Sequence, residues 1–264
     1  MFDSFKFALP LFLVVFATQG RVLPGPAVRA QVPAELERDP AVRAALEKLP
    51  SGLRVALKIA PGPAAEAFRI TQAGGQFTVE SPTALGLAYG AYALAEAPAA
   101  AARAPALEHR MVLLRAPATA AELEPVLGRV VENGANAVLF WGTEDYVPWE
   151  DAGGAEEQQA RARLTEFLRL AHAYHLRLYL FGTELLLPAT ALDALGPEPT
   201  QERINQALRD KYRRLLRAFP DLDGVATMPG EQYPRGRFRR RDVIRHGDGL
   251  ESSYRAFLKA IHGV

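Results

Sequence analysis

Polar side chains that could do chemistry follow four short apolar segments in the second half of the chain. In chain order they are Arg115, Glu144 with Asp145, Glu184 and Glu231, which follow residues 111–114, 137–141, 178–181 and 224–227. Carboxyl groups transfer protons and arginine binds anions. If the apolar segments are parallel strands with helical crossovers, their C-terminal ends meet at one face, and these side chains would gather there.

Aromatic residues accompany the acids after the second segment. Trp141, Tyr146 and Trp149 lie close in sequence to Glu144 and Asp145. Sugar C–H groups stack on aromatic rings and sugar hydroxyls hydrogen-bond to carboxylates, so this cluster suggests carbohydrate binding. The alternative is that Trp141 belongs to the core and Trp149 packs at its rim.

Glu231 is the best candidate for a catalytic acid. It lies between Pro229-Gly230 and Tyr233-Pro234, and an apolar, aromatic wall raises the pKa of a carboxyl group as a general acid requires. Tyr233 is the aromatic candidate for a substrate contact at this position. The alternative is a solvated glutamate in a loop.

Glu184 precedes the apolar run 185–188, where an unpaired carboxylate would be costly. Arg115 is a candidate partner, and a structural ion pair and a substrate contact both fit. Arginines crowd residues 235–245, which suits either a uronic acid substrate or a solvated surface. The spacing of His172, His175 and His246 does not match a metal site, so we expect helix-surface histidines, no metal and no cofactor.

The elements that must position these residues alternate between strand and helix from His109 onward. The patterns predict strands at 109–115, 136–141, 177–183 and 224–227, and helices at 119–133, 156–174, 200–219 and 250–261. A capping box, Thr119-x-x-Glu122, begins the first helix. Four such units are half of a (β/α)₈ barrel, which takes roughly 250 residues, so we expect an incomplete barrel. An open doubly wound sheet is the alternative, although no strand leads into a Gly-rich phosphate loop.

The first part of the chain has a different pattern. It predicts a helix at 34–49, a strand at 53–59, a hairpin formed by 68–70 and 77–79, a helix at 81–95 and a linker at 96–105. We therefore expect an α/β chain with a small α+β domain at 31–105 and the barrel region at 106–264.

Residues 1–30 are interpreted as an export signal. Lys6 precedes an apolar run at 7–18, and Val28-Arg29-Ala30 forms a small-x-small cleavage site. An uncleaved anchor and a strand or helix of the fold are the alternatives, although a spanning helix needs about 20 apolar residues and this run is shorter. The signal predicts a periplasmic or extracellular protein without other membrane contact.

Composition excludes several classes. The chain has 264 residues, of which 31 are basic and 30 acidic, so it has no global field to attract nucleic acid. It has no cysteine, which excludes a disulfide scaffold and thiolate catalysis.

Several stretches resemble bacterial glycoside hydrolases of the α-glucuronidase and β-hexosaminidase groups, in which a small α/β domain precedes a catalytic (β/α)₈ barrel. Residues 66–70, 77–80 and 86–92 are similar to the accessory domain of both groups, and residues 133–139, 219–224 and 230–231 to the second and fourth barrel strands. The adjacent Asp-Glu pair of the hexosaminidases is absent, because Gly230 precedes Glu231. The resemblance implies hydrolysis of O-glycosyl bonds with Glu231 as the acid, in an α-glucuronidase-like position.

The first hypothesis is therefore an exported glycoside hydrolase-like protein that needs the missing half of the barrel for activity. Self-association of two half barrels or a second polypeptide would restore closure, although truncation of the sequence is the simpler explanation. The alternative is a non-catalytic carbohydrate-binding or scaffold protein. A third hypothesis, an α/β metabolic enzyme outside glycoside chemistry, is disfavoured by the lack of a cofactor loop.

Overall fold

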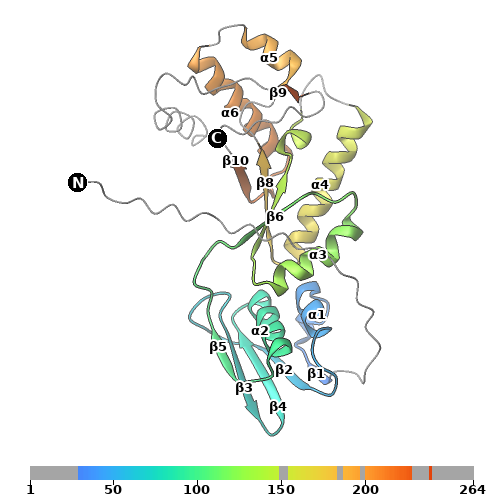
Figure 1. Ribbon diagram of the computed structural model, residues 1–264, viewed down its shortest axis with the longest axis vertical. Helices are drawn as coiled ribbons and strands as arrows, with labels where there is room; N and C mark the ends of the chain where they lie inside the picture. Colours follow the sequence, from blue (N-terminus) through green and yellow to red (C-terminus); the bar gives the residue numbers. More distant parts are fainter. Residues whose placement is uncertain (1–28, 149–153, 183–186, 197–199, 228–237, 240–264) are drawn as a thin grey trace, which may run out of the picture.

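The computed structural model describes residues 29–148, 154–182, 187–196, 200–227 and 238–239, which form two large sheets separated by helices (Figure 1). The predicted signal segment, apart from its last two residues, and the predicted helix at 250–261 lie outside these ranges. The first sheet, at the bottom of Figure 1, is mixed, and the second is entirely parallel. This confirms the predicted order of a small α+β part followed by an incomplete barrel of four strands.

The first sheet has five strands in the order β1-β2-β4-β3-β5. They are β1 (Arg29–Gln31), β2 (Arg54–Ile59), β3 (Phe68–Ala73), β4 (Gln76–Ser81) and β5 (Ala101–Arg103). The predicted hairpin is confirmed: β3 and β4 are antiparallel, and Gly74 and Gly75 between them have φ angles of 55° and 73°. Both central residues of this turn need a positive φ, which glycine adopts without a Cβ clash.

Two segments differ from the sequence prediction. The predicted linker at 96–105 contains β5, which pairs with the free edge of β3 through Ala101 and its two successors. Alanines give little strand signal, so hydrogen bonding to an available edge decides this element. At the other edge, β1 begins at Arg29, so it includes the last two residues of the predicted signal segment, Arg29 and Ala30, which pair with β2.

The single helix predicted at 34–49 is also wrong. The chain forms a 3-10 turn, η1 (Ala34–Leu36), and then α1 (Pro40–Leu46). Pro40 restricts the residue before it to an extended conformation, and Asp39 has φ −66° and ψ 119°. The Asp39 carboxylate accepts a hydrogen bond from the Val42 N–H at 3.0 Å, so a new helix begins there.

Helix α2 (Ala84–Glu96) is buried on two sides and joins the two halves of the molecule. Leu87 and Leu94 pack on the first sheet, whereas Tyr89 and Tyr92 belong to the cluster that continues into the second half. Gly90 allows the close approach to β4, because a Cβ there would lie 2.3 Å from Cγ1 of Val79. Thus part of the resemblance stretch 86–92 has a packing role.

The second sheet has the order β10-β8-β7-β6, and every neighbouring pair is parallel. The strands are β6 (Met111–Leu114), β7 (Ala137–Trp141), β8 (Arg177–Gly182) and β10 (Gly224–Thr227), connected through α3 (Ala120–Glu132), α4 (Ala155–Ala173) and α6 (Gln201–Ala218). Each new strand is added on the same side of the previous one, as in a barrel, whereas a doubly wound sheet reverses direction. Thr119 caps α3 as predicted, accepting a hydrogen bond from the Glu122 N–H at 3.3 Å.

Four short elements were not predicted: η2 (Thr143–Tyr146), β9 (Leu187–Pro188), α5 (Ala189–Leu195) and β11 (Phe238–Arg239). β9 and β11 form a small antiparallel pair. Together with α5 and α6, β9 belongs to a separate cluster around Leu208, which is fully buried.

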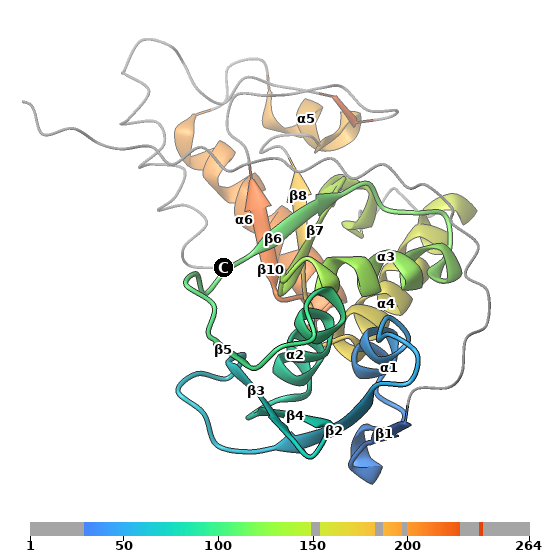
Figure 2. The same ribbon diagram turned by 60° about the horizontal axis from the view of Figure 1, so that its bottom comes forward.

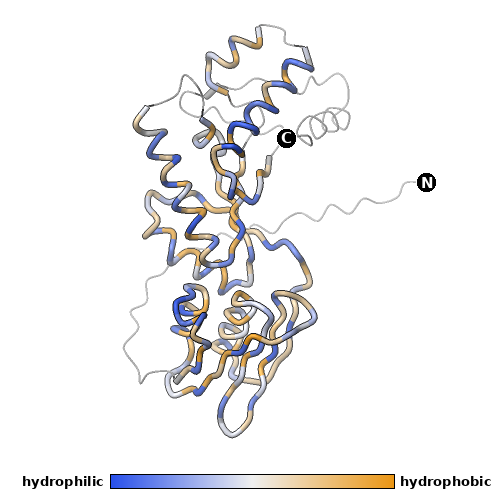
Figure 3. The backbone as a smooth tube through the Cα atoms, turned by 180° about the vertical axis from the view of Figure 1, so that it is seen from behind, coloured by the Kyte–Doolittle hydropathy of each residue, from blue (hydrophilic) through white to orange (hydrophobic). Residues whose placement is uncertain are grey.

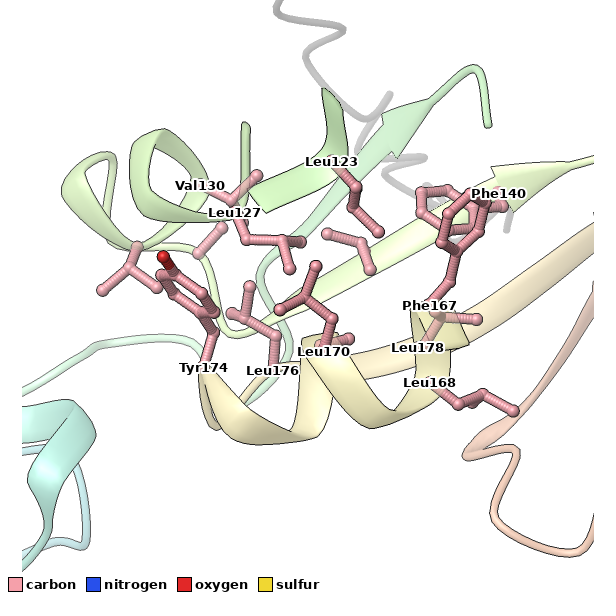
Figure 4. Packing of buried hydrophobic residues seen from close by; sticks show 14 of the residues in the cluster. Leu123, Leu127, Val130, Phe140, Phe167, Leu168, Leu170, Tyr174, Leu176 and Leu178 are labelled. Atoms are coloured by element: carbon pink, nitrogen blue, oxygen red, sulfur yellow. The ribbon is translucent and has the colours of Figure 1, made fainter. Parts of the chain in front are cut away.

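The main core lies between the second sheet and helices α3 and α4, which cover one of its faces (Figures 2 and 4). Leu123 and Leu127 of α3 point into this core, and Phe167 of α4 contacts Phe140 edge to face at 5.6 Å between ring centroids. Hydrophobic residues accordingly dominate the central strands in Figure 3. In the described part of the chain, no helix has the length and apolar character needed to cross a membrane.

Candidate functional site

The C-terminal ends of the four parallel strands lie side by side at one edge of the second sheet (Figure 2). The register aligns Trp141 of β7 with Phe181 of β8, and Phe181 with Ala226 of β10. Leu114 of β6 is level with Phe140, so Arg115 follows at the level of Trp141. The strand ends therefore come together as the sequence predicted, and residues that follow them start from one common edge.

Trp141 and Phe181 form an aromatic pair at this edge. Their ring centroids are 4.7 Å apart and their planes are inclined by 56°. Both side chains are half-buried, and they lie on the face of the sheet opposite to Phe140 and the main core. Trp141 is thus neither fully buried nor isolated, and its ring has surface left for a ligand.

Arg115 has an exposed side chain that makes no hydrogen bond or ion pair with the residues the structure describes. Its predicted partner Glu184 lies outside the described residues, so the ion pair stays a prediction.

The turn after β7 leads directly from the aromatic pair into the acidic segment. Gly142 has φ 104°, and its N–H donates a 2.8 Å hydrogen bond to the carbonyl of Phe181. The backbone of Glu144 and Asp145 continues in η2, but their side chains lie outside the described part. Tyr146 is only 6% exposed and belongs to the main core, so it does not form part of an open aromatic surface.

Thr143, which the sequence analysis did not single out, has an unusual environment. Its side chain is 1% exposed, and Oγ1 has no hydrogen-bond partner among the described residues. Buried hydroxyl groups are nearly always hydrogen-bonded, so this environment is unusual. A threonine after Trp141-Gly142 gives no sequence signal for it.

The remaining predicted site residues, Glu231 and Tyr233, lie outside the described residues, as do Trp149 and most of the arginine-rich segment. Of that segment, Arg239 is described, and its backbone pairs with Leu187. In sequence, Glu231 comes four residues after Thr227, which ends β10.

A second group of polar residues lies at the opposite, N-terminal ends of the strands, where the first part of the chain meets the second sheet. Asn136, 2% exposed, donates from Nδ2 to Glu66 Oε1 at 2.9 Å and to the Glu108 carbonyl at 2.7 Å. Its Oδ1 accepts from the Arg110 N–H at 3.0 Å, and the Arg110 guanidinium pairs with Glu66. We call Glu66, Arg110 and Asn136 the junction network.

The junction network includes residues on which the family resemblance rests, since Glu66 and Asn136 are in the matching stretches. Their position at the N-terminal ends of the strands assigns them to holding the two parts together. Tyr89 of α2 supports the same contact: its hydroxyl donates to the Ala135 carbonyl at 2.8 Å and accepts from Arg110 at 3.2 Å. Burial, and then the nearby Glu66 carboxylate, raise the pKa of Tyr89 to about 12.

A cleft of about 730 Å³ lies beside the junction network, lined by Glu66, Phe68, Arg110 and residues of α2. It is therefore on the side of the molecule away from the strand ends. Its ionic groups are largely paired with one another, through Glu66 with Arg110 and Lys48 with Glu132 at 3.7 Å. This arrangement favours a structural crevice between two packed parts.

Two of the histidines named in the sequence analysis contact aspartates, and the third, His246, lies outside the described residues. His172 Nε2 lies 2.9 Å from Asp223 Oδ2, and His175 Nε2 lies 2.5 Å from Asp39 Oδ2. The second pair links the turn before β8 to the first turn of α1. In the described ranges, His, Asp and Glu residues form no group of three that could hold a metal ion.

Comparisons with known proteins support the architecture. No family model matches the sequence, and no curated relative matches it. Among solved structures, a GH138 enzyme targeting pectin rhamnogalacturonan II aligns with a TM-score of 0.62 at 15% identity, covering 89% of this chain and 41% of that one. A glycoside hydrolase family 20 β-N-acetylglucosaminidase aligns with a TM-score of 0.57 at 17% identity, covering 91% and 61%.

The chain has a glycoside hydrolase-like fold. The GH20 β-N-acetylhexosaminidase of Streptomyces coelicolor A3(2) agrees, with a TM-score of 0.56 at 14% identity and coverage of 92% and 62%. The chain thus spans about two fifths to three fifths of the length of these three structures. The resemblance inferred from the sequence is confirmed at the level of this fold, and fold alone does not fix the reaction.

Proposed function

We propose that the chain is an exported glycoside hydrolase-like protein that hydrolyses O-glycosyl bonds, α-glucuronidase-like or β-hexosaminidase-like, once its barrel is complete. The observation that carries this proposal is the common edge of four parallel strands in a glycoside hydrolase-like fold, with the Trp141–Phe181 pair upon it. Ligands of parallel α/β folds bind at this edge. The substrate is a carbohydrate, and the proposal involves no cofactor.

In this proposal Glu231 is the general acid that protonates the leaving oxygen. Glycoside hydrolysis commonly requires a second carboxyl group, either to activate water or to attack the sugar. Glu144, Asp145 and Glu184 are proposed substrate contacts on neighbouring strand ends. Arg115 would bind an anionic or hydroxyl group of the sugar, and Trp141 and Tyr233 would stack on its ring.

The test is hydrolysis of aryl glycosides of uronic acids and N-acetylhexosamines by the protein with a complete barrel, as the wild type and as Glu231→Gln, with Glu37→Gln as the control. Glu37 is an exposed glutamate in the first part of the chain. We expect Glu231→Gln to lower kcat by about 10²-fold or more, because general acid catalysis contributes 10²–10⁴, and Glu37→Gln to leave it unchanged. Equal activity of the two variants would refute the role of Glu231.

The alternative is non-catalytic carbohydrate binding, which the uncovered aromatic pair at the strand ends favours. Calorimetric titration with the same sugars separates the two functions. Binding that Trp141→Ala abolishes, in a protein that has a complete barrel and hydrolyses none of the glycosides, would support the alternative and overturn the proposal of catalysis.

A further inference from the structure

The first sheet has two faces of different composition. Val55 and Leu57 of β2 and Val79 of β4 point to one face and are buried under α1 and α2. The residues that alternate with them point to the opposite face and are polar or small, as in a sheet with one side in water. We call this opposite face the outer face. In the three central strands it includes Arg54, Ala56, Lys58, Arg69, Thr78 and Glu80.

The outer face points away from the barrel region. Helices α1 and α2 lie between the first sheet and the second part of the chain, and both contribute residues to the main core on their far side (Figures 1 and 2). The edges of the second sheet, β6 and β10, therefore lie beyond these helices. Because the outer face is itself polar, its exposure to water follows from its own residues and not from the state of the barrel.

Positive charge dominates the outer face. Among the described residues, Arg54, Lys58 and Arg69 share this face with a single carboxylate, that of Glu80. The whole chain is nearly balanced, with 31 basic and 30 acidic residues, so the excess is local. The register places Lys58, Glu80 and Arg69 in one row, in which Lys58 donates to Glu80 at 3.1 Å. Arg69 is exposed and makes no hydrogen bond or ion pair with the described part of the chain.

Arg54 is held in place on the hairpin between β3 and β4. Its Nη2 donates to the Gly74 carbonyl at 2.9 Å. Gly75 leaves room for the guanidinium, because a Cβ at this residue would lie 2.8 Å from the same nitrogen. One nitrogen therefore positions the side chain, and the other N–H groups are available to an anion. Guanidinium groups bind carboxylates through two parallel hydrogen bonds.

Between its cations the outer face carries small and hydroxyl-bearing side chains. Ala56 and Thr78 lie side by side at the centre, and Thr71 continues their row on β3. Threonine hydroxyls both donate and accept hydrogen bonds, as sugar hydroxyls do. Arg54 and Lys58 are four residues apart on one strand, or about 13 Å, and Lys58 and Arg69 are two strands apart, or about 10 Å. This spacing of charges on a flat, hydrophilic surface suits an extended polymer with repeated negative charges.

We propose that the outer face binds an anionic polysaccharide, in which the carboxylates of uronic acids contact Arg54, Lys58 and Arg69 and the sugar hydroxyls contact the threonines. Nucleic acid fits less well, because single strands stack their bases on aromatic side chains and the described outer face has none. A membrane surface also fits less well, because interfacial binding needs apolar side chains that enter the lipid. The choice of a polysaccharide rests on the proposed function, which acts on carbohydrate at the other end of the molecule.

Calorimetric titration of the full chain with sodium polygalacturonate is the first measurement, and the fully methyl-esterified polymer is the uncharged control ligand. We expect the charged polymer alone to bind, and its binding to weaken as salt is added. Arg54→Gln combined with Arg69→Gln should weaken binding by about tenfold or more, because two charge-assisted contacts are lost. Arg38→Gln combined with Arg217→Gln is the matched control, since both arginines are exposed and lie outside the outer face. A wild type that does not bind polygalacturonate, or equal affinities of the two double variants, would overturn the proposal.

Glu80→Gln provides a second test, in which binding should improve. The substitution removes the carboxylate of the outer face and releases Lys58 from its ion pair, so we expect polygalacturonate to bind several-fold more tightly. Glu37→Gln removes an exposed carboxylate elsewhere and should have no effect. Unchanged or weaker binding by Glu80→Gln would contradict the proposed charge match.

Two other polyanions identify the class of ligand. A 20-base-pair DNA duplex and vesicles of phosphatidylserine in phosphatidylcholine should both bind more weakly than polygalacturonate at the same salt concentration. Tighter binding of either one would assign the outer face to that ligand and overturn the proposal. These measurements need no hydrolysis, so a protein that cleaves aryl glycosides without binding the polymer refutes this inference alone.

Discussion

The two ends of the parallel sheet differ in how their polar groups are satisfied. At the N-terminal ends, Glu66, Arg110 and Asn136 bond to one another across the boundary between the two parts of the chain. At the C-terminal ends, Arg115 is exposed without a described partner and the Thr143 hydroxyl is buried without one. Polar groups bonded to one another stabilise a fold, whereas groups without a protein partner remain available to a ligand. The contrast supports the proposal that the N-terminal end of the sheet holds the two parts together and that the C-terminal end binds the ligand.

The largest effect is expected from breaking the junction network at Asn136. Asn136→Leu keeps the side-chain volume but removes three hydrogen bonds, to Glu66 Oε1, the Glu108 carbonyl and the Arg110 N–H. Each lost hydrogen bond costs about 1 kcal/mol, so we expect a loss of about 3 kcal/mol in the free energy of unfolding. Urea denaturation followed by circular dichroism measures it.

Asn133→Leu is the control for this substitution. Asn133 is exposed at the end of α3 and donates to the Arg129 carbonyl within the same helix. Its replacement should cost less than about 1 kcal/mol. Equal losses in the two variants would mean that the network contributes no more to stability than an ordinary surface contact.

An intermediate effect, of opposite sign, is expected from two buried hydroxyl groups, one at the end of β4 in the first sheet and one at the C-terminal ends of the second sheet. Ser81, 2% exposed, donates to the Ala67 carbonyl at 2.7 Å, whereas Thr143, 1% exposed, has no partner among the described residues. Ser81→Ala should lower the free energy of unfolding by about 1 kcal/mol or more, and Thr143→Val should leave it unchanged or raise it by up to about 1 kcal/mol. If thermal unfolding shows Thr143→Val to be as destabilising as Ser81→Ala, the Thr143 hydroxyl is satisfied in solution and the comparison fails at that residue.

The sequence predicts the elements of the second part well because each has a strong local signal. Thr119 caps α3, and the apolar runs of β7 and β8 appear as strands with the expected bounds to within a residue. The junction network is different, because it joins Glu66 to Arg110 and Asn136 across 44 and 70 positions, and no local pattern encodes such a contact. The same holds for β5, which exists because β3 offers an edge, and for Thr143, whose isolation depends on packing around η2. The local sequence pattern therefore predicts where the strands end. Only the tertiary contacts show that the N-terminal ends of the second sheet hold the two parts of the chain together.

The smallest effect is expected at the Asp39–His175 pair, which also joins the first part of the chain to the second. Burial alone would raise the pKa of Asp39, but hydrogen bonds from His175 and the Val42 N–H outweigh it and hold the pKa below the ordinary value of 3.8. The folded chain then binds fewer protons at this carboxylate than the unfolded chain. The stabilisation is therefore complete above pH 3.8 and is lost as the pH falls through the lower pKa of the folded state.

Asp39→Asn keeps a helix cap but removes the charge, so we expect it to cost about 1 kcal/mol at pH 6 and progressively less below pH 4. Parallel urea titrations of the wild type and the variant measure this difference, and a gap between them that stays constant down to pH 2 would show that the Asp39 carboxylate does not stabilise the junction through its charge.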